Sequence, residues 1–118
     1  MRLVNLCDHP IDILLSSGER RRLTPSGIVA RVGCSREARE PVAGIAVHAV
    51  TPGAIEGLPA RRSGVLHVAS TLVAQAAAEH GRCDVVAPDT GPESAIRDVD
   101  GRIVAVKGLQ TFGLPRTR

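Results

Sequence analysis

The pattern of hydrophobic and polar positions changes its period between residues 65 and 81. Residues 65–69 are mostly aliphatic and β-branched and predict a buried strand. Ser70-Thr71 follows with two hydroxyl groups, which are suited to the start of a helix. Good helix formers occupy residues 72–80, and Gly81 stands where a helix commonly ends. The sequence therefore predicts a strand followed by a helix near residues 71–80.

A hairpin is predicted further along the chain. Asp100-Gly101 lies between alternating apolar runs at residues 95–99 and 102–108, and Asp-Gly in that setting is a strong turn signal. Asp98 and Asp100 could also suggest a calcium loop, but the other ligands of such a loop are missing, so the turn explains them better. Residues 109–112 are expected to extend the second strand.

The N-terminal third alternates short apolar runs with turn residues about every ten positions. This spacing predicts a meander of four short strands. The predicted strands cover residues 3–6, 11–15, 19–23 and 28–32.

The middle of the chain lacks a clear period. Residues 34–41 are charged and without apolar periodicity, which predicts a surface loop or a mobile flap. Residues 42–50 are apolar again, broken by Gly44. Two prolines and two glycines fall within residues 51–59, which predicts a shaped connection and excludes a long regular element.

These elements define the expected fold class. We predict an α+β fold, predominantly antiparallel β with about six to eight short strands and one principal helix near residues 71–80. A length of 118 residues fits one domain, expected over residues 1–113. Residues 114–118 are expected to form a loose C-terminal tail, because proline and exposed charge offer little to hold them.

The composition implies an unusual core. The chain is 43% hydrophobic but has one aromatic residue, Phe112. The core must therefore be built from valine, isoleucine, leucine and alanine, which bury less area per residue than aromatic side chains. Association with a second copy would cover more apolar surface, so we expect a homo-oligomer.

The net charge of +3 comes from an arginine-rich set of basic residues, with Lys107 as the single lysine. Binding to a nucleic acid polymer is not expected, because such proteins usually combine basic patches with aromatic stacking platforms. Arginine also suits bidentate recognition of phosphate, so a small phosphorylated ligand remains open. The alternative is that these arginines are solvated surface residues.

The three cysteines, Cys7, Cys34 and Cys83, are widely spaced and form no C-x-x-C pair. A disulfide framework is not expected. No stretch has the length of a membrane span, and the apolar run after Met1 is too short for a signal peptide. We therefore expect a cytoplasmic protein that does not bind membranes.

The sequence contains no convincing catalytic constellation. There is no G-x-S-x-G elbow. Cys83 with His80, or Cys7 with His9, could pair as nucleophile and base or supply half of a zinc site. Small buried cysteines are commoner than reactive ones, and zinc sites usually have closely paired ligands in both halves. We therefore expect no enzyme activity, no cofactor and no metal.

Phosphate recognition is the chemistry that the residues favour most. Ser70 and Thr71 lie at the predicted helix start, where free N–H groups and the helix dipole favour an anion. Arg82 and Arg97 could converge there. The polar partners predicted for them are Asp89, Thr90 and Asp98. The alternatives are plain helix capping for the hydroxyls and an arginine–carboxylate network for the charges.

The chain also resembles a group of small phage, prophage and bacterial proteins that begin N-L-T-x-H-x-[IV]. The resemblance rests on motifs spread over nearly the whole chain: residues 4–13, Gly57-Leu58-Pro59, residues 68–74, Arg82-x-Asp84, Pro88-Asp89-Thr90 and Ile96-Arg97-Asp98-x-x-Gly101-x-Ile103. Cys7 replaces the usual threonine.

Some members of this type resemble the phage sponge proteins that counter Thoeris defence by sequestering cyclic ADP-ribose isomers. Related sponges hold cyclic oligonucleotides from CBASS systems. The resemblance implies an oligomer that binds without cleaving, with arginines in pockets near subunit contacts. It predicts a non-catalytic sponge for cyclic nucleotide immune signals, acting in the host cytoplasm if the gene is viral. The alternatives are a homo-oligomeric structural or interaction module without a small-molecule ligand and, third, an enzyme.

Overall fold

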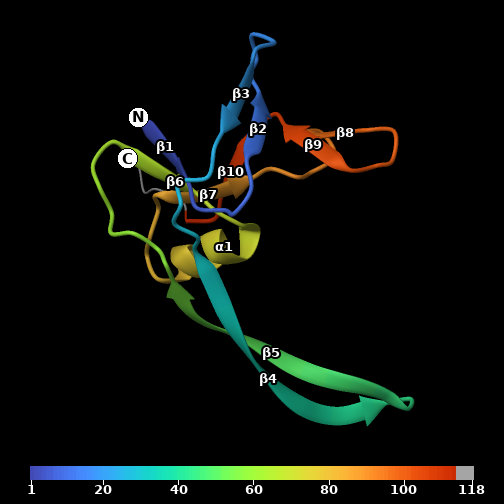
Figure 1. Ribbon diagram of the computed structural model, residues 1–118. Coiled ribbons are helices and arrows are strands. Elements are labelled where there is room, and N and C mark those ends of the chain that lie inside the picture. The colour runs from blue at the N-terminus through green and yellow to red at the C-terminus, as the bar shows by residue number, and fades with distance from the viewer. Residues whose placement is uncertain (114–118) are drawn as a thin grey trace.

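The computed structural model describes residues 1–113, which form ten strands and one helix (Figure 1). The strands are β1 (Arg2–Asn5), β2 (Ile11–Leu14), β3 (Arg20–Leu23), β4 (Arg31–Val42), β5 (Ile45–Glu56), β6 (Val65–Val68), β7 (Val85–Pro88), β8 (Ala95–Arg97), β9 (Ile103–Val106) and β10 (Leu109–Thr111), and the helix is α1 (Thr71–Glu79). The predicted α+β class, dominated by strands with one principal helix, is confirmed. The tail predicted for residues 114–118 lies outside the described residues.

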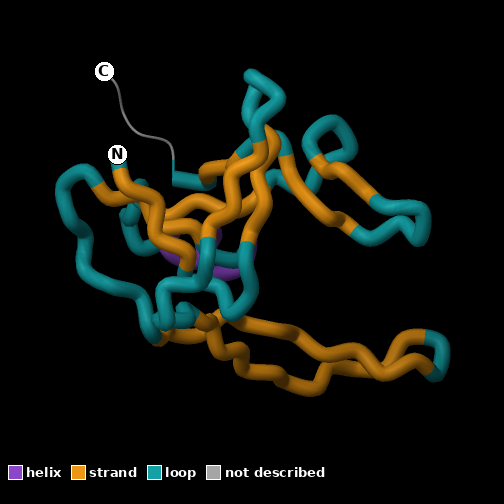
Figure 2. The backbone as a smooth tube through the Cα atoms, turned by 45° about the horizontal axis from the view of Figure 1, so that its top comes forward, coloured by secondary structure: helices purple, strands orange, loops and turns teal. Residues whose placement is uncertain are grey.

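Two four-stranded sheets and a separate hairpin organise the chain. The first sheet has the order β1-β6-β7-β10, with β6 parallel to both β1 and β7 and with β10 antiparallel to β7. The second has the order β3-β2-β9-β8, in which only β2 and β9 are parallel. Strands β4 and β5 pair only with each other. Figure 2 shows this hairpin, which we call the arm, extending away from the two sheets.

The first sheet is the middle layer of the body. Its side chains alternate between its two faces, so Val85 and Ala87 pack against α1 while Val86 packs against the second sheet. Two aliphatic core clusters result, one on each face. Phe112 is partly buried beside the helix cluster, so the predicted aliphatic core is confirmed.

Helix α1 forms where the sequence predicts it. Ser70 is extended, and its hydroxyl accepts a hydrogen bond from the Val73 N–H at 3.3 Å, which caps the helix. The buried face is made of small side chains: Val73, Ala74, Ala76 and Ala77. Because these side chains are short, the helix can approach the sheet closely as it connects the parallel strands β6 and β7.

The arm overturns the predictions for the middle of the chain. Residues 34–41 are not a loop or flap, and residues 51–59 are not only a shaped connection, because β4 and β5 are 12-residue strands. Ala43 and Gly44 both have positive φ, as a two-residue hairpin turn requires. Pro41 and Pro52 are tolerated because the outer edges of a two-stranded ribbon need no N–H groups for ladder hydrogen bonds. Both prolines also lie beside the register shifts near the two ends of the β4–β5 pairing.

Two smaller predictions were also wrong. The N-terminal strands do not form one meander, because β1 pairs with β6 in the first sheet while β2 and β3 join the second. Residues 109–111 do not extend β9 but form β10, antiparallel to β7. In both cases the pairing partner is distant in sequence, so a local pattern could not identify it.

The base of the arm depends on a close backbone contact at Gly57. Gly57 has a φ of +80°, and a Cβ added there would lie 2.3 Å from the carbonyl oxygen of Val29. We expect Gly57→Ala to lower the free energy of unfolding by about 3 kcal/mol, because backbone atoms must move to accommodate the methyl group. Urea unfolding would measure the change.

Gly101→Ala is the matched control. Gly101 has a φ of +82°, but a Cβ there meets nothing within 4 Å. This variant should lose only about 1 kcal/mol, from the left-handed backbone alone. Equal losses for the two variants would contradict the steric role of Gly57.

Candidate functional site

The two arginines predicted to share an anion lie on different elements. Arg82 follows α1 and directs its guanidinium at Asp84. Arg97 lies on β8 in the second sheet, where its Nη1 donates to the carbonyl oxygen of Gly101 at 2.6 Å. The two guanidinium groups bond to separate partners. The structure therefore does not bring Arg82 and Arg97 together as the sequence predicts.

Arg82 belongs to a buried ionic network. Its Nε and Nη2 each donate to Asp84 at 2.8 Å, and Nη2 also donates to the carbonyl oxygen of Pro59 at 3.0 Å. The second carboxylate oxygen of Asp84 lies 3.2 Å from Nδ1 of His67, which is 2% exposed. Hydrogen bonding to Arg82 lowers the pKa of Asp84 to about 2. This is the arginine–carboxylate network considered as the alternative, although its acid is Asp84 rather than Asp89 or Asp98.

The predicted polar partners also have local structural roles. Ser70 caps α1, and Thr71 is its exposed first residue. Asp89 accepts the Gly91 N–H at 3.0 Å. The carboxylate of Asp98 accepts the N–H groups of Asp100 and Arg102, at 2.9 and 3.0 Å, and so shapes the β8–β9 turn. Thr90 lines a cavity of about 250 Å³ between β2 and β9, away from Ser70.

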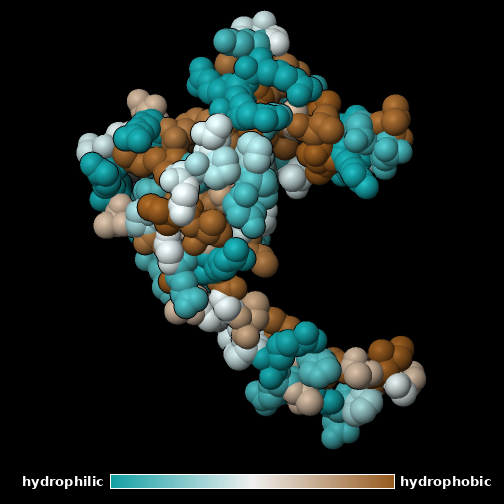
Figure 3. All heavy atoms as spheres, in the orientation of Figure 1, coloured by the Kyte–Doolittle hydropathy of each residue, from teal (hydrophilic) through white to brown (hydrophobic). Residues whose placement is uncertain are grey.

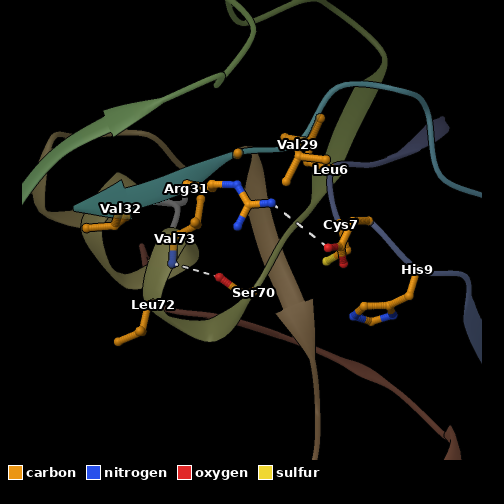
Figure 4. Close-up of a pocket in the computed structure, with 11 residues that line it drawn as sticks. Leu6, Cys7, His9, Val29, Arg31, Val32, Ser70, Leu72 and Val73 are labelled. Atoms are coloured by element: carbon orange, nitrogen blue, oxygen red, sulfur yellow. Dashed lines mark hydrogen bonds and ion pairs between the residues drawn. The ribbon is translucent and has the colours of Figure 1, made fainter. Parts of the chain in front are cut away.

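A cavity of about 320 Å³ lies at the start of α1, and Ser70 is the one residue of the predicted ligand site that lines it (Figure 4). We call it the helix cavity. The sequence does not place Arg31 in a site, and it suggests His9 only as a partner of Cys7, yet all three residues line this cavity. Arg31 reaches toward Asp8 across 3.9 Å, and both side chains are largely exposed. Burial raises the pKa of the Cys7 thiol at the cavity wall, which disfavours the reactive thiolate.

Asn5 fixes the loop that forms one wall of the helix cavity. It is 2% exposed, and its amide nitrogen donates to the carbonyl oxygens of His9 and Leu23, at 3.0 and 2.9 Å. Its amide oxygen accepts the Cys7 N–H at 2.8 Å. These bonds join β1 to β3 and to the loop between β1 and β2, so Cys7 and His9 of that loop are held in place beside the helix start.

A second recess lies at the base of the arm. We call it the base recess; it measures about 150 Å³, and its lining residues are Val32, Cys34, Val50, Leu72, Gln75, Ala76 and Glu79. Leu72 is 65% exposed although it lies in the first turn of a helix packed on the sheet. At the far end of the arm, Val42 and Ile45 are 63% and 67% exposed and, with Val47, form what we call the tip patch.

Two further observations bear on function. Among residues 1–113, no three His, Cys, Asp or Glu side chains lie close enough together to hold a metal ion. Over the same range, no helix has both the length and the apolar content to cross a bilayer.

No family model, no curated protein and no solved structure matches this chain. The resemblance to sponge proteins therefore stays a prediction from the sequence motifs.

The Asp84 network makes a pH-dependent contribution to stability. Because the pKa of Asp84 is depressed, the contribution is complete above the ordinary pKa of about 4 and is lost as the pH falls toward 2. We expect Asp84→Asn to lower the free energy of unfolding by about 3 kcal/mol at pH 7, leaving Arg82 partly buried without its partner. Urea unfolding between pH 7 and 3 should show the difference from wild type narrowing with acidity.

Asp12→Asn provides the comparison. Asp12 also pairs with an arginine, Arg22, at 2.8 Å, but Arg22 is 62% exposed. Losing this exposed ion pair in Asp12→Asn should leave the urea midpoint of unfolding nearly unchanged. A gap between wild type and Asp84→Asn that stays constant from pH 7 to 3 would contradict the assignment of the low pKa to Asp84.

Proposed function

We propose that this protein is a non-catalytic interaction module that assembles as a homo-oligomer through its arm. One observation carries the proposal: the arm extends from the body with exposed aliphatic side chains along it (Figure 3). The exposed members are the tip patch and Val50, which is 55% exposed. Val42, Ile45 and Val47 lie on one face of the ribbon near its turn, and a cluster of exposed aliphatic side chains of this kind is typical of an interaction site.

The dimensions of the chain support the same proposal. The radius of gyration is 16.6 Å, whereas a compact chain of this length is expected near 13.5 Å. The accessible surface of the whole chain is 7979 Å², whereas a compact monomer of this mass is expected to expose about 6,100 Å². The excess is roughly twice the 800 Å² or so that each partner contributes to a stable interface.

Self-association can be tested at the tip patch. We expect the wild-type protein to sediment as a dimer or larger oligomer and Ile45→Glu to weaken association by at least about tenfold, because a charge would be buried without a partner. The thermal unfolding midpoint should change little, since Ile45 is 67% exposed in the single chain.

Val99→Glu is the matched control, because Val99 is fully exposed but lies on the β8–β9 turn, outside the arm. It should leave the sedimentation unchanged. A wild-type protein that stays monomeric at every accessible concentration would overturn the proposal.

Sequestration of a cyclic nucleotide signal is the second candidate, and the helix cavity favours it. Arg31, the hydroxyl of Ser70 and the start of α1 lie around a hollow of about 320 Å³ that a small anionic ligand could enter. The free thiols and the sponge resemblance fit such a role in the cytoplasm. The exposed Arg31–Asp8 pair is a weaker anion site than the convergent arginines that the sequence predicts.

Isothermal titration with cyclic ADP-ribose isomers and cyclic trinucleotides tests this candidate. If the helix cavity is the site, Arg31→Gln should weaken binding by about tenfold, and Arg97→Gln should not change it. Loss of binding in Arg97→Gln alone would instead favour the arrangement predicted from the sequence. No heat with any of these nucleotides would remove the sponge candidate and leave self-association standing.

A further inference from the structure

The outer edges of β4 and β5, two strands of 12 residues each, are the longest unpaired strand edges in the described chain, and the edge of β4 carries the charges. One edge of β4 pairs with β5, and the other has no partner among residues 1–113. The backbone N–H and C=O groups of this edge that face away from β5 are a template for another strand between the register shifts near its two ends; Pro41, beside the second shift, has no N–H. Side chains facing solvent on both sides of the ribbon leave the approach to this edge open.

The charges along β4 are ordered in a way that suits one particular partner. Residues 36–40 read Arg, Glu, Ala, Arg, Glu. Around Ala38, every basic position on one side mirrors an acidic position on the other. An antiparallel copy of the same strand, centred on Ala38, would therefore place opposite charges together, whereas a parallel copy in register would place like charges together.

We propose that β4 of two copies pair antiparallel about a two-fold axis at Ala38, giving a continuous four-stranded sheet from two arms. In this register Arg36 lies opposite Glu40 of the partner subunit, and Glu37 lies opposite Arg39 of the partner subunit. The inference rests on the proposed self-association and adds its register and symmetry. An isologous contact of this kind closes at two copies and does not propagate into a fibre.

The ends of the arm fit the same arrangement. Val42 comes eight positions after Cys34, which corresponds to about 27 Å of extended strand. With the axis at Ala38, which is halfway, the tip patch of one copy lies level with the base recess of the other. Along β5, Val50 lies on the opposite face of the ribbon from Ile45 and Val47, so this match is one of position along the strands and not a contact between the tip patch and the base recess.

In the single chain the central charges satisfy each other. Nη1 of Arg39 lies 2.6 Å from the Glu37 carboxylate on the same face of β4, and both side chains are more than half exposed. Across the axis the same residues become a cluster of two acids and two bases. The outer edge of β5 offers no such order, since His48 is its only titratable group between Ile45 and Thr51.

Charge reversal separates contacts within a chain from contacts between chains. Glu37→Arg and Arg39→Glu each destroy the pair within the chain, and in each homodimer they also place like charges across the axis. We expect each variant alone to dimerise about tenfold more weakly than wild type. Mixed together, the two should recover a heterodimer near wild-type affinity, because opposite charges meet again only between chains. Glu19→Arg, an equal charge change on an exposed residue outside the arm, should have no effect.

A symmetric cross-link measures the register. In a Cys34→Ser, Cys83→Ser background, which removes both exposed thiols, Ala38→Cys should oxidise to a covalent dimer, because facing residues across an antiparallel pair lie within disulfide reach. Ala49→Cys on β5 should not. An oligomer in which Ala49→Cys cross-links, or in which the mixed variants fail to recover, would overturn the register while leaving self-association intact. A monomeric wild-type protein would overturn both.

Discussion

The close approach of a small-residue helix to strand β7 is the contact on which the body depends. Ala74 and Ala77 face Val85 and Ala87, and these side chains are buried almost completely. Methyl and isopropyl groups bury little area, so each contact stabilises weakly and the sheet needs a second layer on its other face. A core built in this way is thin. It offers no broad apolar surface on which a hairpin of two 12-residue strands could fold back.

The ionic network ties this thin core to the base of the arm. Asp84 is 8% exposed, and a carboxylate so buried requires both N–H groups that Arg82 directs to it. The remaining bond of Arg82 goes to the carbonyl of Pro59, shortly after β5 ends. Gly57 makes its close contact with Val29 between these points. The arginine that sequence reasoning assigned to a ligand therefore orients the arm instead, and binding a phosphate would break those bonds.

The parts of the fold that could be predicted from sequence are those specified locally. Ser70 caps a helix within three residues of itself, and the Asp100-Gly101 turn joins strands that adjoin it. Strand pairings between distant segments, such as β1 with β6, could not be predicted, because no pattern within either segment identifies its partner. The helix cavity was missed for the same reason, since Arg31 and Ser70 meet only after β4 passes the helix start.

The arm escaped prediction because a two-stranded ribbon buries neither face. Apolar alternation predicts strands that have one buried side, and β4 is exposed along almost its whole length. Its charges and Pro41 are also typical of edge strands that resist pairing. To prevent pairing with any other strand, however, an edge strand needs only charges of one sign, or prolines along its length. Here Pro41 lies at the end of β4, and the charges between it and Cys34 alternate so that one antiparallel register is neutral in every pair. In the arrangement we propose, such an edge would reject unrelated strands and parallel copies while accepting its own two-fold mate, as a specific interface does and a protected surface does not.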